Sequence, residues 1–439
     1  MWVSVRPVRR KVMPTVNSLF PCAQREFSQL RALIASRLLK KNEKIEVCIE
    51  SINHMGIGVA NYNGEKIYIP TVLPGERVTA KIVKLFDDHC LAEAIHLVTK
   101  SAHRVEPKCG YYTVCNGCQF QHASYEYQQN WKKELVVRHM QAFGVDVAVK
   151  DVVASKHMYN YRTKITPHYN PPKRADGVVQ IGFRSRYHGG ILDVAQCAIA
   201  TDAINVKLIQ HRKGVRTRIT ESEKRLKKGA SLILRDNGDG DVSTDHRDLI
   251  TQRVGELLLS YNAGEFFQTN AQLLPALVQH VVDQAAGHLC DHLIDTYCGC
   301  GIFALSAAST FDSVAGIDIS KHSIHRAREN AKMNNITNAT FVWGKVEELF
   351  KDVSGIPRER SVVVIDPSRS GCDVTFLTQL FEFSPRKVVY VACEPSTQAR
   401  DAKLIVNAGY DIVDITPFDM FPQTRHVENV ITFYNKEYY

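Results

Sequence analysis

Short, almost wholly apolar segments alternate with helix-like stretches along the C-terminal part of the chain. These segments span residues 292–297, 314–318, 340–343, 361–366 and 387–393. Apolar runs of this length are typical of strands that are buried on both faces, as parallel strands are when helices cover them. The pattern therefore predicts a doubly wound α/β domain, in which ligands bind at the carboxyl ends of the strands.

Residues with reactive or charged side chains stand where several of these segments end. Asp318, Asp366 and Cys393 end three of them, and Glu428 comes just before a final strand. Strand ends are where a doubly wound sheet assembles its binding and catalytic groups. The sequence therefore places a cysteine and carboxylates at the expected ligand site.

The turn after the first of these segments leaves two cofactors open. Residues 299–304 match a loose G-x-G-x-x-A pattern, in which the glycines let the backbone approach a ligand. Asp318 can bind ribose hydroxyls. Both features suit a nicotinamide dinucleotide and S-adenosylmethionine equally well, so an oxidoreductase remains a rival to a methyltransferase at this point.

Three cysteines lie close together in a turn-rich loop of the N-terminal half. Cys109, Cys115 and Cys118 have the spacing C-x5-C-x2-C, and Cys197 is the best candidate for a fourth ligand. Thiolates grouped in this way can converge on one soft metal centre, either an all-cysteine zinc site or an iron–sulfur cluster. The spacing does not choose between zinc and iron, and reduced, unligated thiols are the alternative.

Other N-terminal segments suggest RNA contacts. Residues 44–98 alternate short strand-like pieces with turns, which is typical of a small β-barrel. Residues 161–168 and 180–186 mix aromatic and cationic side chains, a composition that suits phosphates and stacked bases. An ordinary solvated hairpin face has the same composition.

The charge of the chain is concentrated in its first residues. Residues 1–42 hold nine Lys or Arg and one Glu, which accounts for most of the formal net charge of +9. Such an Arg-rich, acid-poor leader is typical of a transit peptide, and we expect a mitochondrial one. The alternative is a disordered basic tail that helps to bind a phosphate backbone.

Composition excludes several classes of protein. With 44% hydrophobic and 23% charged residues, the chain is not generally disordered. It holds no uninterrupted apolar stretch of about 18 residues, which argues against a membrane span. Twelve cysteines in 439 residues are too few for a secreted disulfide scaffold, so we expect an intracellular, reducing compartment. That compartment is mitochondrial if the leader is a transit peptide, and otherwise cytoplasmic or nuclear.

Motifs along most of the chain resemble the RNA (uracil-5-)-methyltransferase family. The resemblance runs from about Lys44 to Phe433. The motifs that carry it are FFQTN at 266–270, DTYCGCG at 295–301, DPSRSG at 366–371, ACEPSTQARD at 392–401 and FPQTRHVENV at 421–430.

The resemblance implies roles for particular residues. Cys393 would be the nucleophile and Glu428 the base that removes a ring proton. Four residues match positions that bind S-adenosylmethionine, namely Gln268, Tyr297, Asp318 and Asp366. Four cysteines match the ligands of a [4Fe–4S] cluster, namely Cys109, Cys115, Cys118 and Cys197.

The same resemblance implies the chemistry. Uracil C5 is too weak a carbon nucleophile to take a methyl group unaided. A thiolate that adds to C6 converts the ring to an enolate, which then attacks the methyl group of S-adenosylmethionine. A base must next remove the C5 proton. Because a stacked base is inaccessible, we expect the target uridine to be flipped into the pocket.

Two residues depart from the family pattern. Ser368 stands where a proline or alanine is usual, and Glu394 stands where asparagine is common. An extra anion beside the nucleophile would raise the pKa of the thiol and slow its attack. These two departures are the only support for a further alternative, a catalytically inactive RNA-binding protein.

The segments at 161–168, 264–268 and 418–428 most resemble eukaryotic, fungal-type enzymes that act on the T-loop uridine of tRNA. Relatives that act on ribosomal RNA share the cysteines and the barrel, so rRNA is the second candidate substrate. We expect RNA as the partner, no membrane, and a monomer.

The expected architecture is an α/β protein whose C-terminal domain is a Rossmann-like class I methyltransferase fold. Its expected parts are a basic leader at 1–43, an OB-like TRAM barrel at 44–100, a central α+β domain with the iron–sulfur site at 101–262, and the methyltransferase domain at 263–439.

Overall fold

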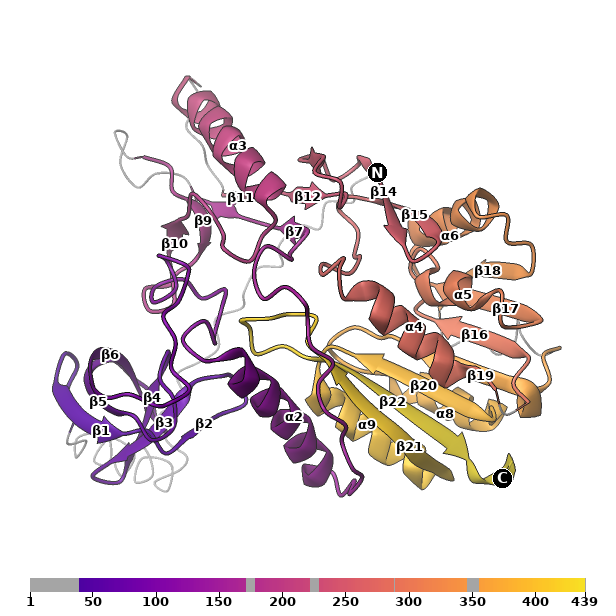
Figure 1. Cartoon of the computed structure of the whole chain (residues 1–439), viewed down its shortest axis with the longest axis horizontal. Coiled ribbons are helices and arrows are strands. Elements are labelled where there is room, and N and C mark those ends of the chain that lie inside the picture. The colour runs from indigo at the N-terminus through magenta and orange to yellow at the C-terminus, as the bar shows by residue number, and fades with distance from the viewer. Residues whose placement is uncertain (1–38, 171–177, 222–228, 288, 346–354, 439) are drawn as a thin grey trace, which may run out of the picture.

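The structure is a computed structural model that describes residues 39–170, 178–221, 229–287, 289–345 and 355–438. The expected transit peptide lies almost wholly outside these residues. Figure 1 shows a barrel-like lobe and a sheet-and-helix lobe, with irregular segments and two long helices between and above them. None of the helices described is long and apolar enough to cross a membrane.

The N-terminal lobe is a six-stranded sheet in the order β1-β5-β6-β4-β3-β2. Its strands are β1 (Lys44–Cys48), β2 (Ser51–Ile52), β3 (Gly58–Tyr62), β4 (Glu65–Ile69), β5 (Arg77–Leu85) and β6 (Cys90–Thr99). Neighbours are antiparallel except β4 and β6. Alternate residues point into one core, as Ile45 and Val47 do in β1, because side chains alternate between the faces of a strand. The short strands expected here are therefore present.

The segment after the barrel forms two small antiparallel sheets beside a long helix. The helix is α3 (Asp202–Glu221), and the sheets have the orders β10-β9-β8-β11 and β13-β12-β7. The strands are β7 (Lys164–Ile165), β8 (His168–Tyr169), β9 (Ile181–Arg184), β10 (Ile191–Asp193), β11 (Ala230–Ser231), β12 (Leu234–Asp236) and β13 (Val242–Ser243). Buried Arg212 on α3 ties helix and sheet together, because it donates to Ile181 O at 2.9 Å and to Asp193 Oδ2 at 2.7 Å.

The C-terminal lobe is a seven-stranded sheet in the order β18-β17-β16-β19-β20-β22-β21. Its strands are β16 (His292–Thr296), β17 (Ser313–Asp318), β18 (Ala339–Trp343), β19 (Ser361–Ile365), β20 (Lys387–Ala392), β21 (Tyr410–Phe418) and β22 (Glu428–Asn435). Strands β16 to β20 are parallel, and β22 is antiparallel to both of its neighbours. This confirms the expected doubly wound sheet.

Helices cover both faces of that sheet. Alternate residues of β19 enter different cores: Val362 and Val364 pack with α4 (Leu274–Ala285), α5 (Ile302–Ala307) and α6 (Lys321–Met333). Val363 and Ile365 pack with α8 (Val374–Phe383) and α9 (Pro395–Asn407) on the other face. The strand order reverses between β16 and β19, and such a reversal opens a crevice at the carboxyl ends of the strands.

Two elements from the range 101–262 pack on the C-terminal lobe. Helix α2 (Tyr125–Ala142), whose N-cap is Ser124, places Val136 and Met140 in the core of α8 and α9. The hairpin of β14 (Leu249–Val254) and β15 (Leu257–Asn262) is joined to α6, because Ser260 N donates to Asn330 Oδ1 at 2.8 Å. The domain boundary expected between residues 262 and 263 therefore does not separate two independently packed units.

Candidate active site and cysteine pocket

A pocket of about 680 Å³ lies at the carboxyl ends of the parallel strands. It is lined by every residue for which the sequence predicted a catalytic or cofactor-binding role. These are Gln268, Tyr297, Asp318, Asp366, Cys393 and Glu428. They come from segments up to 160 residues apart in the chain, and the sheet topology brings them together. We call this cavity the reaction pocket.

The turn after β16 is shaped for close approach of a ligand. Tyr297, Gly299 and Gly301 all have positive φ, at 64°, 55° and 92°. A Cβ on Gly301 would also lie 3.1 Å from Leu305 and Phe341, so only glycine fits there. Asp318 fixes this turn from the next strand, because its Oδ2 accepts from Gly299 N at 3.0 Å and its Oδ1 from Ser320 N at 2.7 Å.

The segment before α4 presents both a polar atom and an apolar ring to the pocket. Gln268 is 6% exposed, and its buried Oε1 has no hydrogen-bond partner in the structure. An unsatisfied buried acceptor is costly, so this atom is suited to a donor group of a ligand. Phe266 is 79% exposed, whereas its neighbour Phe267 is buried and stacks on Tyr261 at 4.0 Å. Phe266 belongs to the FFQTN motif at 266–270, but the motif predicted a role only for Gln268.

Two carboxyl groups and the thiol interact inside the pocket. Glu428 is 1% exposed and its Oε2 has no hydrogen-bond partner. Burial, together with the nearby Asp366 carboxylate, raises the pKa of Glu428 well above its ordinary value. Burial raises the pKa of Asp366 to about 7. Burial and then the Glu428 carboxylate raise the pKa of Cys393 to about 12, against the lowering effect of Arg369.

Glu394 is not among the largest influences on the pKa of the thiol. The carboxylates that most raise the pKa of Cys393 are those of Glu428 and Asp366. Glu394 Oε1 instead accepts from Ser396 Oγ at 2.9 Å, and its charge acts on Arg425 and His139. Glu394 is the N-cap residue of α9, so the chain enters this helix directly after the nucleophile.

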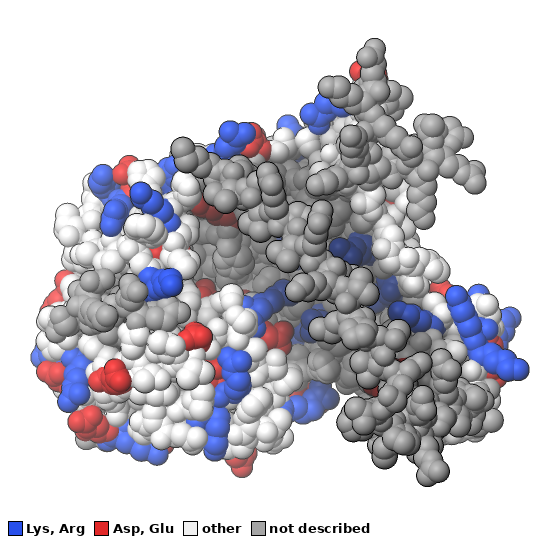
Figure 2. All heavy atoms as spheres, turned by 180° about the vertical axis from the view of Figure 1, so that it is seen from behind, with Lys and Arg blue, Asp and Glu red and all other residues white. Residues whose placement is uncertain are grey.

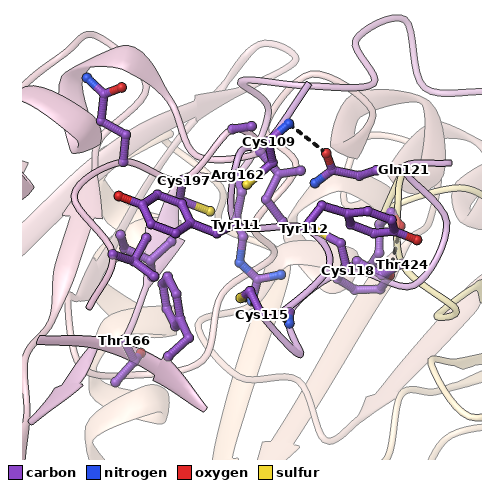
Figure 3. A pocket seen from close by; sticks show the side chains of 18 of the residues that line it. Cys109, Tyr111, Tyr112, Cys115, Cys118, Gln121, Arg162, Thr166, Cys197 and Thr424 are labelled. Atoms are coloured by element: carbon purple, nitrogen blue, oxygen red, sulfur yellow. Dashed lines mark hydrogen bonds between the residues drawn. The ribbon is translucent and has the colours of Figure 1, made fainter. Parts of the chain in front are cut away.

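The four cysteines of the predicted cluster line a second pocket, of about 340 Å³. Figure 3 shows Cys109, Cys115 and Cys197 with their sulfur atoms turned toward a common space. Burial raises the pKa of Cys118, and the other three thiols raise it further. Within the described part of the chain, no group of His, Cys, Asp or Glu is arranged to hold a metal ion. We call this cavity the cysteine pocket.

Arginines and backbone amides surround these sulfurs. Arg162 extends between the cysteines (Figure 3), and its charge lowers the pKa of Cys197 against the effect of burial. Arg186 Nη2 donates to the carbonyl oxygens of Cys115 at 2.8 Å and Cys118 at 2.7 Å. Gly117 N donates to Cys115 Sγ at 3.4 Å. Cations and N–H donors around thiols favour an anionic sulfur centre.

The two pockets share part of their lining, namely Arg162, Arg369 and Phe421. His426 lines the cysteine pocket, and burial followed by the charges of Arg369 and Arg425 lowers its pKa to about 3. The region between the pockets is therefore strongly cationic. Figure 2 shows Lys and Arg side chains gathered in the hollow between the two lobes. The sequence pointed to the segment that holds Arg162 but not to its place between two sites.

Comparisons with known proteins agree with this geometry. Residues 242–436 match the family model described as tRNA (Uracil-5-)-methyltransferase. A tRNA (uracil(54)-C(5))-methyltransferase of Schizosaccharomyces pombe is 35% identical, over 92% of this chain and 80% of its own length. One of the same description from Saccharomyces cerevisiae is 30% identical, over 83% of this chain and 68% of its own.

A solved structure has a similar fold. It is the tRNA (uracil-54, C5)-methyltransferase of Pyrococcus abyssi in complex with S-adenosyl-L-homocysteine, with a TM-score of 0.68 and 23% sequence identity. The match covers 89% of this chain and the whole of that one.

Proposed function

The chain belongs to the tRNA (uracil-5-)-methyltransferase family, and we propose that it transfers a methyl group from S-adenosylmethionine to C5 of a uridine in the T loop of tRNA. The observation that carries this proposal is the joint presence of Cys393 and Glu428 in the reaction pocket. A nicotinamide oxidoreductase has no use for this pair. The pair supplies both groups that C5 methylation requires.

The first half of the reaction uses Cys393. Its thiolate adds to C6 of the uracil ring, the electrons pass to C5, and C5 attacks the methyl carbon of the sulfonium, which leaves as a thioether. Because the Glu428 carboxylate raises the pKa of the thiol, the thiolate forms more readily while Glu428 is protonated. Arg369 favours the thiolate by its charge.

The second half uses Glu428. Its carboxylate takes the proton from C5, the C6–sulfur bond breaks, and the thiolate returns to Cys393. Desolvation makes this carboxylate a stronger base than one in water. Before this step Glu428 must release its own proton to water. It does so more readily once the sulfur is bonded to C6, because no thiolate charge then opposes the charge of the carboxylate.

Gln268, Tyr297, Asp318 and Asp366 are the proposed binding residues for the methyl donor. The support is their shared position on the crevice side of the sheet, where the turn after β16 brings the backbone close to a ligand. Asp318 would bind ribose hydroxyls with lone pairs not used by the turn, and Gln268 Oε1 would accept from a polar group of the ligand.

The function is tested by nucleoside mass spectrometry. Purified tRNA and rRNA are incubated in parallel with the protein and S-adenosylmethionine, and the nucleosides of each are analysed. We expect 5-methyluridine in tRNA, at one T-loop position. 5-Methyluridine in rRNA alone would replace the proposed substrate with the second candidate, and its absence from both would overturn the proposed function.

We further propose that Cys109, Cys115, Cys118 and Cys197 hold a [4Fe–4S] cluster. The support is the donor set: four thiols line one pocket, although the described residues are not grouped as a site for a single metal ion. Arg162 and Gly117 N lie beside the thiols and would offset negative charge. A bound cluster would cross-link two loops that are far apart in sequence. Anaerobic purification should give iron and sulfide in equal amounts with visible absorbance, whereas zinc alone would identify the other metal.

The N-terminal lobe is a proposed TRAM-type RNA-binding module, supported by its six-stranded sheet and by the cationic hollow beside it (Figure 2). A mitochondrial transit peptide in residues 1–42 and a monomeric protein also remain proposals. Diffuse fluorescence of a reporter fused to residues 1–42 would contradict the first. A mass in solution well above 49.5 kDa would contradict the second.

A further inference from the structure

The loop that joins β21 to β22, residues 419–427, is held by segments that lie far away in sequence. It receives hydrogen bonds from residues between 119 and 161, and Tyr161 OH, for example, donates to Pro422 O at 3.0 Å. Two side chains of α2 lie at the centre of this arrangement. They are Gln128 and Lys132, both buried, and the proposed function assigns no role to either.

Gln128 makes a two-way amide contact with Gln423. Gln423 N donates to Gln128 Oε1 at 2.9 Å, and Gln128 Nε2 lies 3.2 Å from Gln423 Oε1. Gln423 O accepts from the backbone N of Gln119 and Phe120 at 2.9 and 3.0 Å. Gln423 has φ +69°, a conformation that is unfavourable for a residue with a Cβ. These contacts therefore hold the loop in a conformation that it would not adopt alone.

Lys132 holds the start of the same loop. Its Nζ donates to Asp419 Oδ1 at 2.5 Å and to Phe421 O at 3.1 Å. Both charged side chains are fully buried. A buried pair of this kind adds little to stability but fixes one arrangement, since every other arrangement leaves a charge unpaired.

The loop leads directly into the proposed base. Phe421 and Glu428 line the reaction pocket, whereas Thr424 and His426 line the cysteine pocket. Glu428 Oε2 has no hydrogen-bond partner. The orientation of the Glu428 carboxylate is therefore not fixed by a hydrogen bond to this oxygen. Glu428 is the first residue of β22 and pairs there with Phe418 of β21. The loop of residues 419–427 therefore closes this hairpin immediately before the carboxylate.

We propose that Gln128 and Lys132 are positioning residues, which orient Glu428 for removal of the C5 proton without taking part in attack by Cys393. This inference rests on the proposed function. Cys393 follows β20, which pairs with β22 on one side, where Ala392 lies opposite Asn429, and with the parallel strand β19 on the other. Part of the support for Cys393 is therefore independent of the loop. Loosening the loop should therefore slow the second half of the reaction and spare the first.

The two halves can be measured separately on the intact protein. Transcripts with 5-fluorouridine carry no C5 proton that a base can remove, so adduct formation reports the first half. With ordinary tRNA, the protein–RNA adduct accumulates only if proton removal has become slow. Both species are counted on a denaturing gel, beside the rate of 5-methyluridine formation.

Gln128→Met removes both contacts to Gln423 at similar volume, together with the hydrogen bonds from Gln128 Nε2 to Phe120 O and Ala123 O. Gln128→Glu keeps the acceptor for Gln423 N. Gln252→Met is the matched control, because Gln252 is a buried glutamine in β14 whose Oε1 accepts a hydrogen bond from Tyr261 OH. The double variant Lys132→Met with Asp419→Asn removes the second contact without leaving a buried charge. For Gln128→Met and the double variant, we expect 5-methyluridine formation to fall at least about tenfold. Their 5-fluorouridine adduct should form at the wild-type rate, and adduct with ordinary tRNA should accumulate.

Gln128→Glu should not recover the turnover, because its second oxygen would face the acceptors Phe120 O and Ala123 O. Gln252→Met should behave as wild type. Equal loss of both halves in the Gln128 and Lys132 variants would overturn the positioning role, as would no change in either half. Failure of the wild-type protein to form any adduct or product would instead overturn the proposed function. The two failures are therefore distinguishable.

Discussion

The reaction pocket and the cysteine pocket are neighbours that are built in different ways. The reaction pocket takes its reactive groups from the ends of regular strands, where β17, β19 and β20 stop and β22 begins. The cysteine pocket takes its thiols from irregular loops that arginine and amide donors hold in place. A site on strand ends inherits the rigidity of the sheet. A site on loops depends on cross-links between them.

This difference predicts opposite results when a thiol is removed from each pocket. Cys393→Ala should reduce 5-methyluridine formation by more than about 10⁴-fold, because the reaction has no other route through C6. Its iron content and thermal unfolding should stay as in the wild type. The measurements are methylation of tRNA, iron analysis and a thermal melt.

Cys197→Ala is the counterpart in the cysteine pocket. It should lose iron and unfold at a lower temperature, while any folded protein still forms the 5-fluorouridine adduct. If Cys393→Ala retained methylation, or if Cys197→Ala retained a full complement of iron, the division of labour between the pockets would be wrong.

The next effect concerns the base. Glu428→Gln should lower turnover by about 10²- to 10⁴-fold, the usual contribution of a general base. Because attack by Cys393 precedes proton removal, adduct with ordinary tRNA should accumulate. A denaturing gel measures the fraction of protein that is covalently bound to tRNA. A variant with wild-type turnover would show that another group removes the proton.

A smaller effect is expected at the mouth of the reaction pocket. A phenyl ring that is 79% exposed offers a stacking surface, and base–aromatic stacking contributes about 1 to 3 kcal/mol. Phe266→Ala should therefore raise KM for tRNA about 5- to 150-fold, with a smaller change in kcat. Phe266→Tyr, which keeps the aromatic face, is the control. Equal kinetics for the alanine and tyrosine variants would remove this role.

The last prediction concerns the dependence of stability on pH, not the rate of the reaction. Burial raises the pKa of Asp366 from 3.8 to about 7, so the folded protein holds a proton there that the unfolded chain has lost. Stability is full at acid pH and falls as pH rises through about 7. Asp366→Asn should remove this fall, worth about 1 to 4 kcal/mol between pH 5 and 8. Urea unfolding at both pH values measures it, and parallel pH dependence of variant and wild type would contradict it.

Sequence patterns predicted the regular pocket better than the irregular one. The apolar segments that became β16 to β20 were recognisable because a buried strand is apolar on both faces. Asp318, Asp366 and Cys393 followed from their places at the ends of those segments. The convergence of Cys197 with the other three thiols could not be derived from spacing, because irregular loops determine it. Cys197 was only the best candidate for a fourth ligand until the family resemblance supported it.

Other features had no local signal. Helix α2 buries Gln128 and Lys132, so its apolar stripe is interrupted and the periodicity of a half-buried helix is lost. Those polar residues are satisfied by a loop about 290 residues later. Arg162 and Phe266 also reach the pockets from outside the sheet, where no strand-end rule applies. The hydrogen bond from Ser396 to Glu394 had no local signal either, because proximity in sequence does not determine where a side chain points.

Helix α2 makes the halves of this molecule hard to exchange. It follows the barrel in the chain, yet its Val136 and Met140 fill a core made by α8 and α9. A chimaera of two relatives joined at residue 143 would set a helix from one parent against a sheet from the other. A junction before residue 119 would keep helix, loop and sheet from a single parent. Junctions for recombinant chimaeras should therefore lie outside residues 119–161. A junction inside this range would separate residues that contact each other across the two parents.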